Sequence, residues 1–134
     1  FVLSENSEGF KKMTVPVRFG LGAPLGSGKQ YMPWIHLDDL CRIYVKAVED
    51  TAMQGVYNAV APESVTNALF MKTMAKEMKR PFFFPKIPAF MLRLMMGEAA
   101  DMLLEGSRVS SQKISDAGYQ FLYPTVSEAI RASL

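Results

Sequence analysis

The stretch Leu25-Gly-Ser-Gly-Lys-Gln-Tyr-Met-Pro-Trp-Ile-His-Leu-Asp-Asp-Leu40 decides the fold class, because it passes from loop to strand to helix. The glycines of residues 20–28 predict a loop, and the aromatic and β-branched residues of 31–37 predict a strand. Asp38 and Asp39 stand where a helix N-cap is expected. The apolar residues that follow have helical spacing and predict one buried face: Leu40, Ile43, Tyr44, Ala47 and Val48. A strand that leads directly into a helix indicates a mixed α/β class.

The flanking sequence predicts further short elements of both kinds. Strands are expected at residues 1–3, 56–60 and 82–84, and a polar loop at residues 4–9. Helices are expected after Thr66 and after Pro88, with shorter ones at residues 98–104 and 111–117. A capping box, Thr125-Val-Ser-Glu128, predicts the start of a last helix. We therefore expect few short strands and several helices, an α+β arrangement when the chain is taken alone.

Composition and charge exclude several classes of function. The net charge is only +2, from 15 basic and 13 acidic residues, which argues against nucleic acid or an anionic membrane surface as a partner. No apolar run approaches the ~20 residues that cross a bilayer. Cys41 is the only cysteine and His36 the only histidine, so neither a disulfide nor a metal site is expected. The single cysteine indicates a reducing compartment, and we expect a cytoplasmic protein.

Three features invite a chemical interpretation, and each has a simpler structural explanation. In the glycine-rich loop, Gly28-Lys29 is followed by Gln30 and Ala23 stands where a phosphate-binding loop needs its first glycine, so we expect a surface loop. The Asp38–Asp39 pair is explained by helix capping rather than by acid–base chemistry. His36 is expected to pack or hydrogen-bond beside the start of the helix.

The segment Ile87–Met96 is the longest apolar run of the chain. Its helical part, residues 89–96, is apolar on nearly all sides, so it is expected to be buried or to be covered by something else. One alternative function follows from it: a non-catalytic module that uses this segment to bind another protein. A position near Trp34 as a lid would favour an enzyme instead.

The Leu25–Leu40 stretch resembles a segment of extended short-chain dehydrogenases/reductases, in which an aromatic residue, an apolar residue, a His and an Asp lead into a helix. Its Pro33-Trp-Ile-His36 form is similar to a subgroup of NAD(P)-dependent epimerases/dehydratases described as cell-division-inhibitor-like. Residues 55–58, 103–109 and 118–124 are similar to the same subgroup, in the same order. The resemblance covers essentially the whole chain.

The resemblance implies an organisation and a set of site residues. Residues 1–60 would be the end of a Rossmann-like part and residues 61–134 a small helical, substrate-side domain. Val2, Leu3 and Ser4 would flank the nicotinamide of NAD or NADP. The substrate cleft would contain Met13, Gln30, Trp34 and Arg108, although core packing explains Trp34 equally well.

The resemblance also implies what this chain lacks. The family's catalytic pair is a Tyr with a Lys four residues later, and none of the five tyrosines here is followed by such a lysine. The glycine-rich turn that binds pyrophosphate belongs to the preceding half of the family fold. We therefore expect no catalysis by this chain alone. Its expected partners are a small-molecule substrate and the missing N-terminal Rossmann half, with homo-association where that half is absent.

One position departs from the nucleotide-sugar epimerases that the family includes. Many of them carry an arginine four residues before the His, where it meets the substrate diphosphate, and this chain has Met32 there. A dianion needs a cation, which methionine does not supply. Arg108 or Lys29 could take its place. We therefore expect an oxidoreductase related to nucleoside-diphosphate-sugar epimerases/dehydratases, with the substrate left open.

Overall fold

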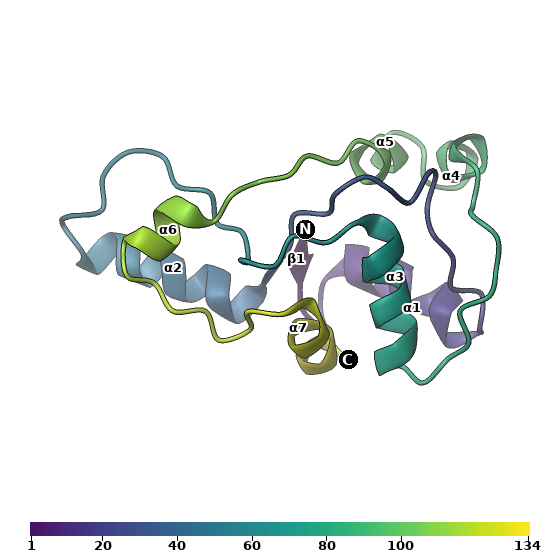
Figure 1. Cartoon of the computed structure of the whole chain (residues 1–134), viewed down its shortest axis with the longest axis horizontal. Helices are drawn as coiled ribbons and strands as arrows, with labels where there is room; N and C mark the ends of the chain where they lie inside the picture. The colour runs from purple at the N-terminus through teal and green to yellow at the C-terminus, as the bar shows by residue number, and fades with distance from the viewer.

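The computed structural model describes residues 1–134, which form seven helices and two very short strands (Figure 1). In chain order the elements are β1 Val2–Leu3, α1 Glu8–Arg18, β2 Ile35–His36, α2 Leu37–Glu49, α3 Asn67–Glu77, α4 Ala89–Met96, α5 Ala99–Leu104, α6 Gln112–Asp116 and α7 Val126–Ser133. The predicted mixture of several helices with few short strands is confirmed. No helix has both the length and the apolar composition that a membrane crossing requires.

The two strands form a parallel pair at the centre of the molecule. Val2 lies opposite Ile35 and Leu3 opposite His36. The strand expected at residues 31–37 is therefore shorter than predicted. The strands expected at residues 56–60 and 82–84 are wrong, because these segments are extended loops with no neighbouring strand, and Val56 and Phe83 face solvent. Apolar β-branched and aromatic residues favour a strand only where a sheet surface is there to receive them.

Helix α1 begins where the sequence predicted a loop. The side chain of Ser7 caps it by accepting a hydrogen bond from the backbone N–H of Phe10. The helix contains Pro16, which disguises the pattern. Its buried residues nevertheless have helical spacing: Phe10, Met13, Thr14 and Val17. That spacing was the signal for this helix.

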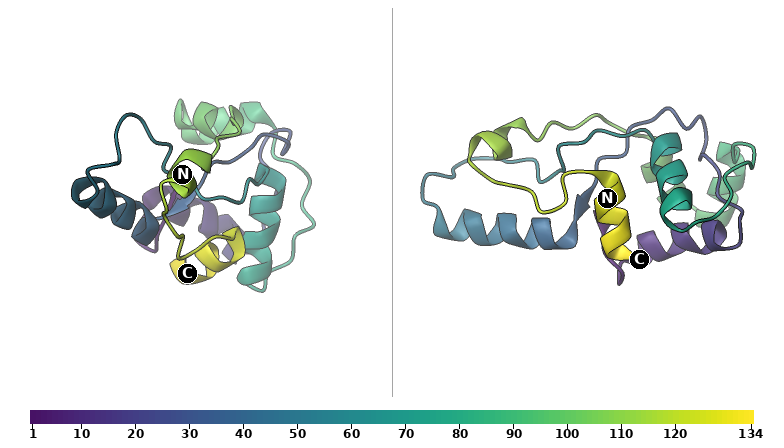
Figure 2. Two further views of the ribbon diagram at one scale, coloured as in Figure 1. Left: turned by 60° about the vertical axis from the view of Figure 1, so that its left-hand side comes forward. Right: turned by 60° about the horizontal axis from the view of Figure 1, so that its bottom comes forward.

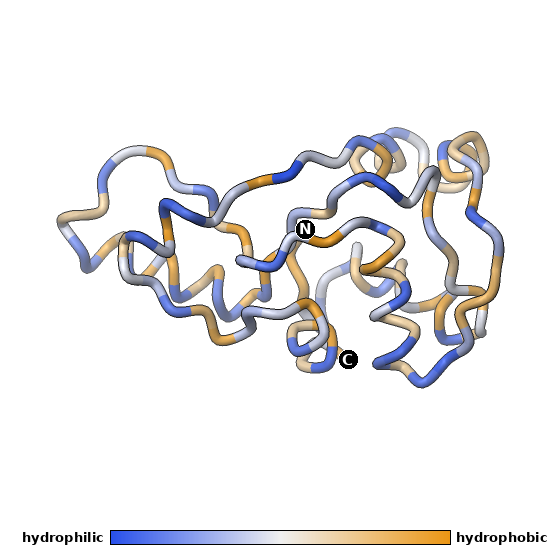
Figure 3. Tube along the Cα trace, in the orientation of Figure 1, coloured by the Kyte–Doolittle hydropathy of each residue, from blue (hydrophilic) through white to orange (hydrophobic).

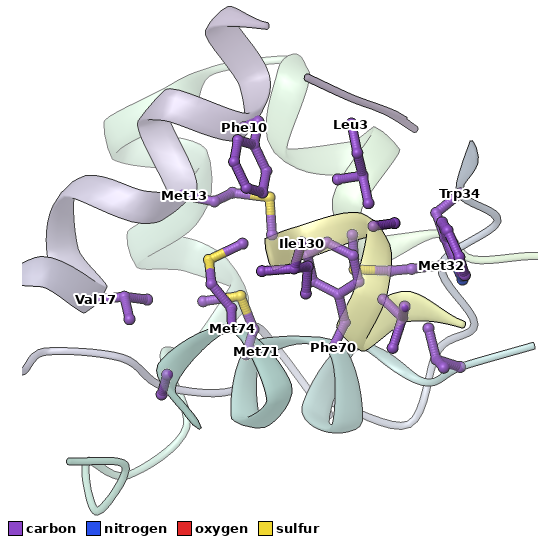
Figure 4. Close-up of a cluster of buried hydrophobic side chains, with 14 of the residues drawn as sticks. Leu3, Phe10, Met13, Val17, Met32, Trp34, Phe70, Met71, Met74 and Ile130 are labelled. Carbon is purple, nitrogen blue, oxygen red and sulfur yellow. The ribbon is translucent and has the colours of Figure 1, made fainter. Parts of the chain in front are cut away.

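The main hydrophobic core joins β1, α1, α3 and α7. Leu3 and Phe10 meet Phe70 of α3 and Ile130 of α7, and all four are buried (Figure 4). Methionines from α1 and α3 fill the space between these larger side chains, a use that suits the flexible thioether. This core fixes β1 against the helices and so fixes the start of the site described below.

A second, smaller core lies under the other end of the molecule, between α2 and α6 (Figure 1). Its buried members are Ile35, Ile43, Ile114 and Tyr119. The helix predicted after residue 38 is confirmed as α2, but its predicted buried face is only partly right: Ile43 is buried, whereas Tyr44 and Val48 are exposed.

The prediction that Asp38 or Asp39 is the N-cap of α2 is wrong, although both lie in its first turn, where a carboxylate suits the helix dipole as expected. His36 is the N-cap of α2, and its Nδ1 accepts a hydrogen bond from the backbone N–H of Asp38 at 3.2 Å. This agrees with the expectation that His36 serves the start of the helix. Asp39 is completely buried in the first turn and binds the chain between α6 and α7 instead.

A candidate ligand cleft beside the parallel strands

A cavity of about 460 Å³ opens beside the start of β1. One wall consists of Phe1, of Gly9 and Met13 on α1, and of residues 31–33. The other consists of Met96, Ala99, Met102 and Leu103 on the α4–α5 hairpin, with residues 105–107 after it. In Figure 1 the hairpin lies above the N-terminus of the chain. We call this cavity the cleft.

The α4–α5 hairpin is held over the cleft by its own small core and by the loop before β2. Leu92 and Ala100 pack on Leu25. The backbone N–H of Gly26 donates to the carbonyl of Ile87 at 2.8 Å, and the N–H of Ile87 donates to the carbonyl of Pro24 at 2.9 Å. These contacts attach the hairpin to the glycine-rich loop, and Figure 2 shows the same hairpin from two further directions.

The glycine-rich loop is itself a packing element. A Cβ on Gly26 would come within 2.5 Å of Cδ2 of Leu104. The loop is thus closed against α5 by the chain's own side chains, which supports the predicted surface loop over a phosphate-binding loop.

Met32 lines the cleft, and Asn67 holds its side chain in place. It is buried, and its sulfur accepts a hydrogen bond from Nδ2 of Asn67 at 3.2 Å. Asn67 is buried too, and its Oδ1 accepts from the backbone N–H of Leu25 at 2.7 Å. The residue that replaces the arginine of many nucleotide-sugar epimerases is therefore built into the loop structure.

At the rim, the segment after α5 lies directly on Tyr31. A Cβ on Gly106 would come within 2.0 Å of the carbonyl oxygen of Tyr31, so this close approach requires glycine. The Arg108 guanidinium lies 5.7 Å from the centre of the Tyr31 ring. Glu105 is the only charged side chain among the residues that line the cleft.

The structure separates the four residues predicted to line the substrate cleft. Met13 lines it. The side-chain amide of Gln30 donates to the carbonyls of Leu25 and Leu103, at 2.9 and 3.0 Å, and so ties the loop to the hairpin. Trp34 packs in the main core, the other alternative of the sequence analysis, and its Nε1 donates to the Glu63 carbonyl. Arg108 lines a neighbouring polar hollow instead of the cleft.

The three residues predicted to flank a nicotinamide lie in β1 and directly after it, and none of them lines the cleft, although the preceding Phe1 does. The side chain of Leu3 is completely buried in the main core, whereas Val2 and Ser4 are half-buried. A ligand could therefore touch Leu3 only through its backbone. Contact of these residues with a cofactor stays a prediction.

Most of the cleft was missed by sequence reasoning. Tyr31, Met32, Met96 and Met102 are all lining residues, drawn from two segments about 65 residues apart along the chain. The unusual apolar character of the α4 segment and the methionine at position 32 were noticed in the sequence. No local pattern indicates that the two segments face each other.

No three acidic, histidine or cysteine side chains come together as they would to hold a metal ion. Tyr119 donates a 2.6 Å hydrogen bond to Oδ1 of Asp39, and burial together with this bond raises the pKa of Tyr119 well above its usual value. A tyrosine held in this way has a structural role and not that of an acid–base catalyst.

Comparison with known proteins gives the chain its relatives. Residues 87–133 match a family model described as a domain of unknown function, DUF1731. The chain is 41% identical over 131 residues to mouse "Epimerase family protein SDR39U1", covering 97% of this chain and 44% of that protein. It is 32% identical over 118 residues to "Epimerase family protein YfhF" of Bacillus subtilis, covering 88% of this chain and 39% of that protein. The chain thus spans less than half the length of these curated relatives.

Solved structures of epimerase-family proteins are similar to this chain as well. The crystal structure of human epimerase family protein SDR39U1 (isoform 2) with NADPH superposes with a TM-score of 0.91 at 38% identity, covering 98% of this chain and 45% of that chain. The Thermus thermophilus UDP-glucose 4-epimerase complex with NAD shares the fold, with a TM-score of 0.67 at 16% identity. These two neighbours were solved with NADPH and with NAD.

Proposed function

We propose that the chain is the C-terminal part of an epimerase-like protein similar to SDR39U1, and that it forms the substrate side of an NAD(P)-dependent epimerase or reductase. In that protein a nucleotide-binding half would supply the catalytic residues, and the cleft of this chain would hold the substrate. NADPH is the cofactor we propose first, because the human relative was solved with it.

One observation carries the proposal: the cleft adjoins β1. The resemblance assigns residues 2–4 to the nicotinamide side of the fold, and Phe1 is already part of the cleft wall. A substrate in the cleft would therefore lie next to the ring that exchanges a hydride with it. Reacting atoms that are held side by side gain the advantage of proximity.

The residues of this chain could contact a nicotinamide but would not form its whole binding site. Val2 and Ser4 are half-buried and could contact it, and Leu3 could offer its backbone. When bound, NAD(P) would supply hydride transfer. The apolar walls of the cleft would exclude water from the reacting centre. Acid–base chemistry would come from outside this chain, because its tyrosines lack the paired lysine and Tyr119 is bound to Asp39.

Two finer assignments stay predictions. Membership of the cell-division-inhibitor-like subgroup rests on the Pro33–His36 motif and the segments that accompany it. A cytoplasmic location rests on Cys41, which is free and exposed.

The alternative function as a protein-interaction module has one observation in its favour. On the outer face of α4, Phe90, Leu94 and Met95 are exposed. The same helix, however, ends at Met96 in the cleft wall, so the hairpin also acts as a lid. A lid favours an enzyme, although the position expected for it was beside Trp34, whereas the hairpin lies over the cleft beside Met32.

Calorimetric titration tests the proposed function. NADPH and NADH would be titrated into this 134-residue chain and into the complete protein to which it belongs. We expect binding by the complete protein, with NADPH preferred, and no measurable heat from the chain alone. Micromolar binding by the chain alone, or no binding by the complete protein, would overturn the proposal.

A further inference from the structure

The cleft has a chemical character that identifies the kind of molecule it can hold. Eight of its lining residues are hydrophobic, and four of these are methionines: Met13, Met32, Met96 and Met102. Its volume of about 460 Å³ lies in the range of sites for small molecules. Methionine side chains adapt to the shape of an apolar ligand. The cleft is therefore suited to a compact apolar body.

The side chains of the cleft oppose an anionic ligand, and the α-amino group of Phe1 in its wall already donates to the carbonyl of Pro33 at 2.7 Å. Glu105 is the only charged side chain in its lining, and a carboxylate repels a phosphate group. Arg108 and Lys29 are absent from the lining, and the Arg108 guanidinium is placed over the ring of Tyr31. A buried diphosphate would need paired cations or several N–H donors. Met32, fixed by Asn67, supplies neither.

The polar groups of the lining suit a single neutral oxygen. Tyr31 and Ser107 are the lining residues whose side chains carry a hydroxyl group. A hydroxyl can donate to a carbonyl oxygen and can also accept from an alcohol. An apolar ligand with one such oxygen would meet complementary groups here without leaving a charge buried.

We propose that the cleft binds an uncharged, mainly apolar alcohol or carbonyl compound, and that it does not accept a nucleoside diphosphate sugar. This inference rests on the proposed function, because it names the substrate class of the same site. It extends that function from a general oxidoreductase to one that acts on an apolar alcohol–ketone pair.

The test is a binding experiment on the 134-residue chain without cofactor. The neutral fluorescent dye Nile red would report occupation of the cleft, and UDP-glucose would be titrated by calorimetry. We expect saturable dye binding and no heat from UDP-glucose up to millimolar concentration. Tighter binding of UDP-glucose than of the dye, or the absence of dye binding, would overturn the proposal.

A matched pair of variants places the dye in the cleft. Met102 and Met95 are both exposed, by 83% and 76%, on the same hairpin, but only Met102 lines the cleft. Met102→Glu should weaken dye binding by about tenfold, because it adds a charge to an apolar site. Met95→Glu should change it less than twofold. Equal losses in both variants would put the dye on the outer surface of the hairpin and overturn the proposal.

This experiment is independent of the test of the proposed function. Cofactor binding by the complete protein can succeed while the dye experiment fails, and then only the substrate class is wrong. If the dye binds the cleft but no NAD(P) binds the complete protein, the proposed oxidoreductase is wrong and the apolar site remains.

Discussion

Asp39 forms long-range hydrogen bonds that the residues around it in the sequence do not indicate. Its Oδ1 accepts hydrogen bonds from the Tyr119 hydroxyl at 2.6 Å and from the Leu122 backbone N–H at 2.8 Å, and its Oδ2 accepts one from the Tyr123 N–H at 3.0 Å. All three donors lie at least 80 residues away along the chain. The local motif predicts that Asp39 caps the helix. Its actual hydrogen-bond partners are distant in sequence, and only the tertiary fold brings them to it.

Removing this carboxylate should destabilise the fold strongly. Asp39→Ala leaves several buried donors without a partner, each costing about 1–3 kcal/mol in principle, so we expect a loss of at least ~2 kcal/mol. Tyr119→Phe removes a single bond to a charged acceptor and should cost about 1.5–3 kcal/mol. Urea denaturation would measure both. Asp38→Ala, at an exposed position one residue earlier, should cost less than about 1 kcal/mol; an equal loss there would contradict this explanation.

Glu77 should make stability depend on pH in the acid range. Its carboxylate accepts hydrogen bonds from Arg131 and Ser127 and so joins α3 to α7. The bond from Arg131, followed by that from Ser127, lowers the pKa of Glu77 in the folded protein. Its stabilising effect is therefore complete above the ordinary glutamate pKa of about 4.3 and is lost as the pH falls through the lower folded value.

The measurement is the urea midpoint at pH 7, 5 and 3. Glu77→Gln should be less stable than the unmodified chain at pH 7 and should lose less stability on acidification. Glu49→Gln, at an exposed position on α2, provides the control and should follow the unmodified chain. A Glu77→Gln variant with an unchanged acid dependence would refute the assignment.

At the scale of elements, the sequence predicted best what is encoded locally. The helix after Pro88, the short helix that follows it and the capping box of α7 all occur where expected. Each depends on residues within one or two turns. The false strands at 56–60 and 82–84 depend on whether another strand lies beside them, which is a property of the tertiary fold. The cleft is of the second kind, because its walls come from segments far apart in sequence.

At the scale of elements, we predict the effect of a substitution in the linker that follows α5. Gly106 lies so close to Tyr31 that an added Cβ would overlap the Tyr31 carbonyl oxygen. Gly106→Ala should push the linker and the α4–α5 hairpin away, at a cost of about 1–3 kcal/mol. Hydrogen exchange should then become faster in α4 and α5 and remain unchanged in α3 and α7. Ser107→Ala is the neighbouring control, and faster exchange in that variant would show that the close approach is not the cause.

At the scale of the whole molecule, the chain has a very small sheet and an exposed apolar face on α2. Its sheet has only two parallel strands, and parallel sheets are normally covered on both faces. The outer face of α2 is apolar along its whole length, with exposed residues at helical spacing: Leu37, Cys41, Tyr44, Val45 and Val48. Figure 3 shows the orange segments that alternate along this helix, and Figure 1 shows that it lies with α6 at one end of the molecule. Relatives more than twice as long have further chain available to cover such a face.

In the chain alone, we expect a second copy to cover this face of α2. Sedimentation velocity at tens of micromolar should show a dimer that dissociates on dilution, because apolar surface is removed from water when the two helices pack. The double variant Val45→Asp, Val48→Asp should be a monomer. Leu94→Asp, at an equally exposed site on α4, should still form the dimer. If Leu94→Asp is the variant that becomes monomeric, the two copies contact each other through the α4–α5 hairpin and not through α2. The partner-binding surface of this chain would then lie on the hairpin that covers the cleft. That result would favour the alternative function in protein interaction.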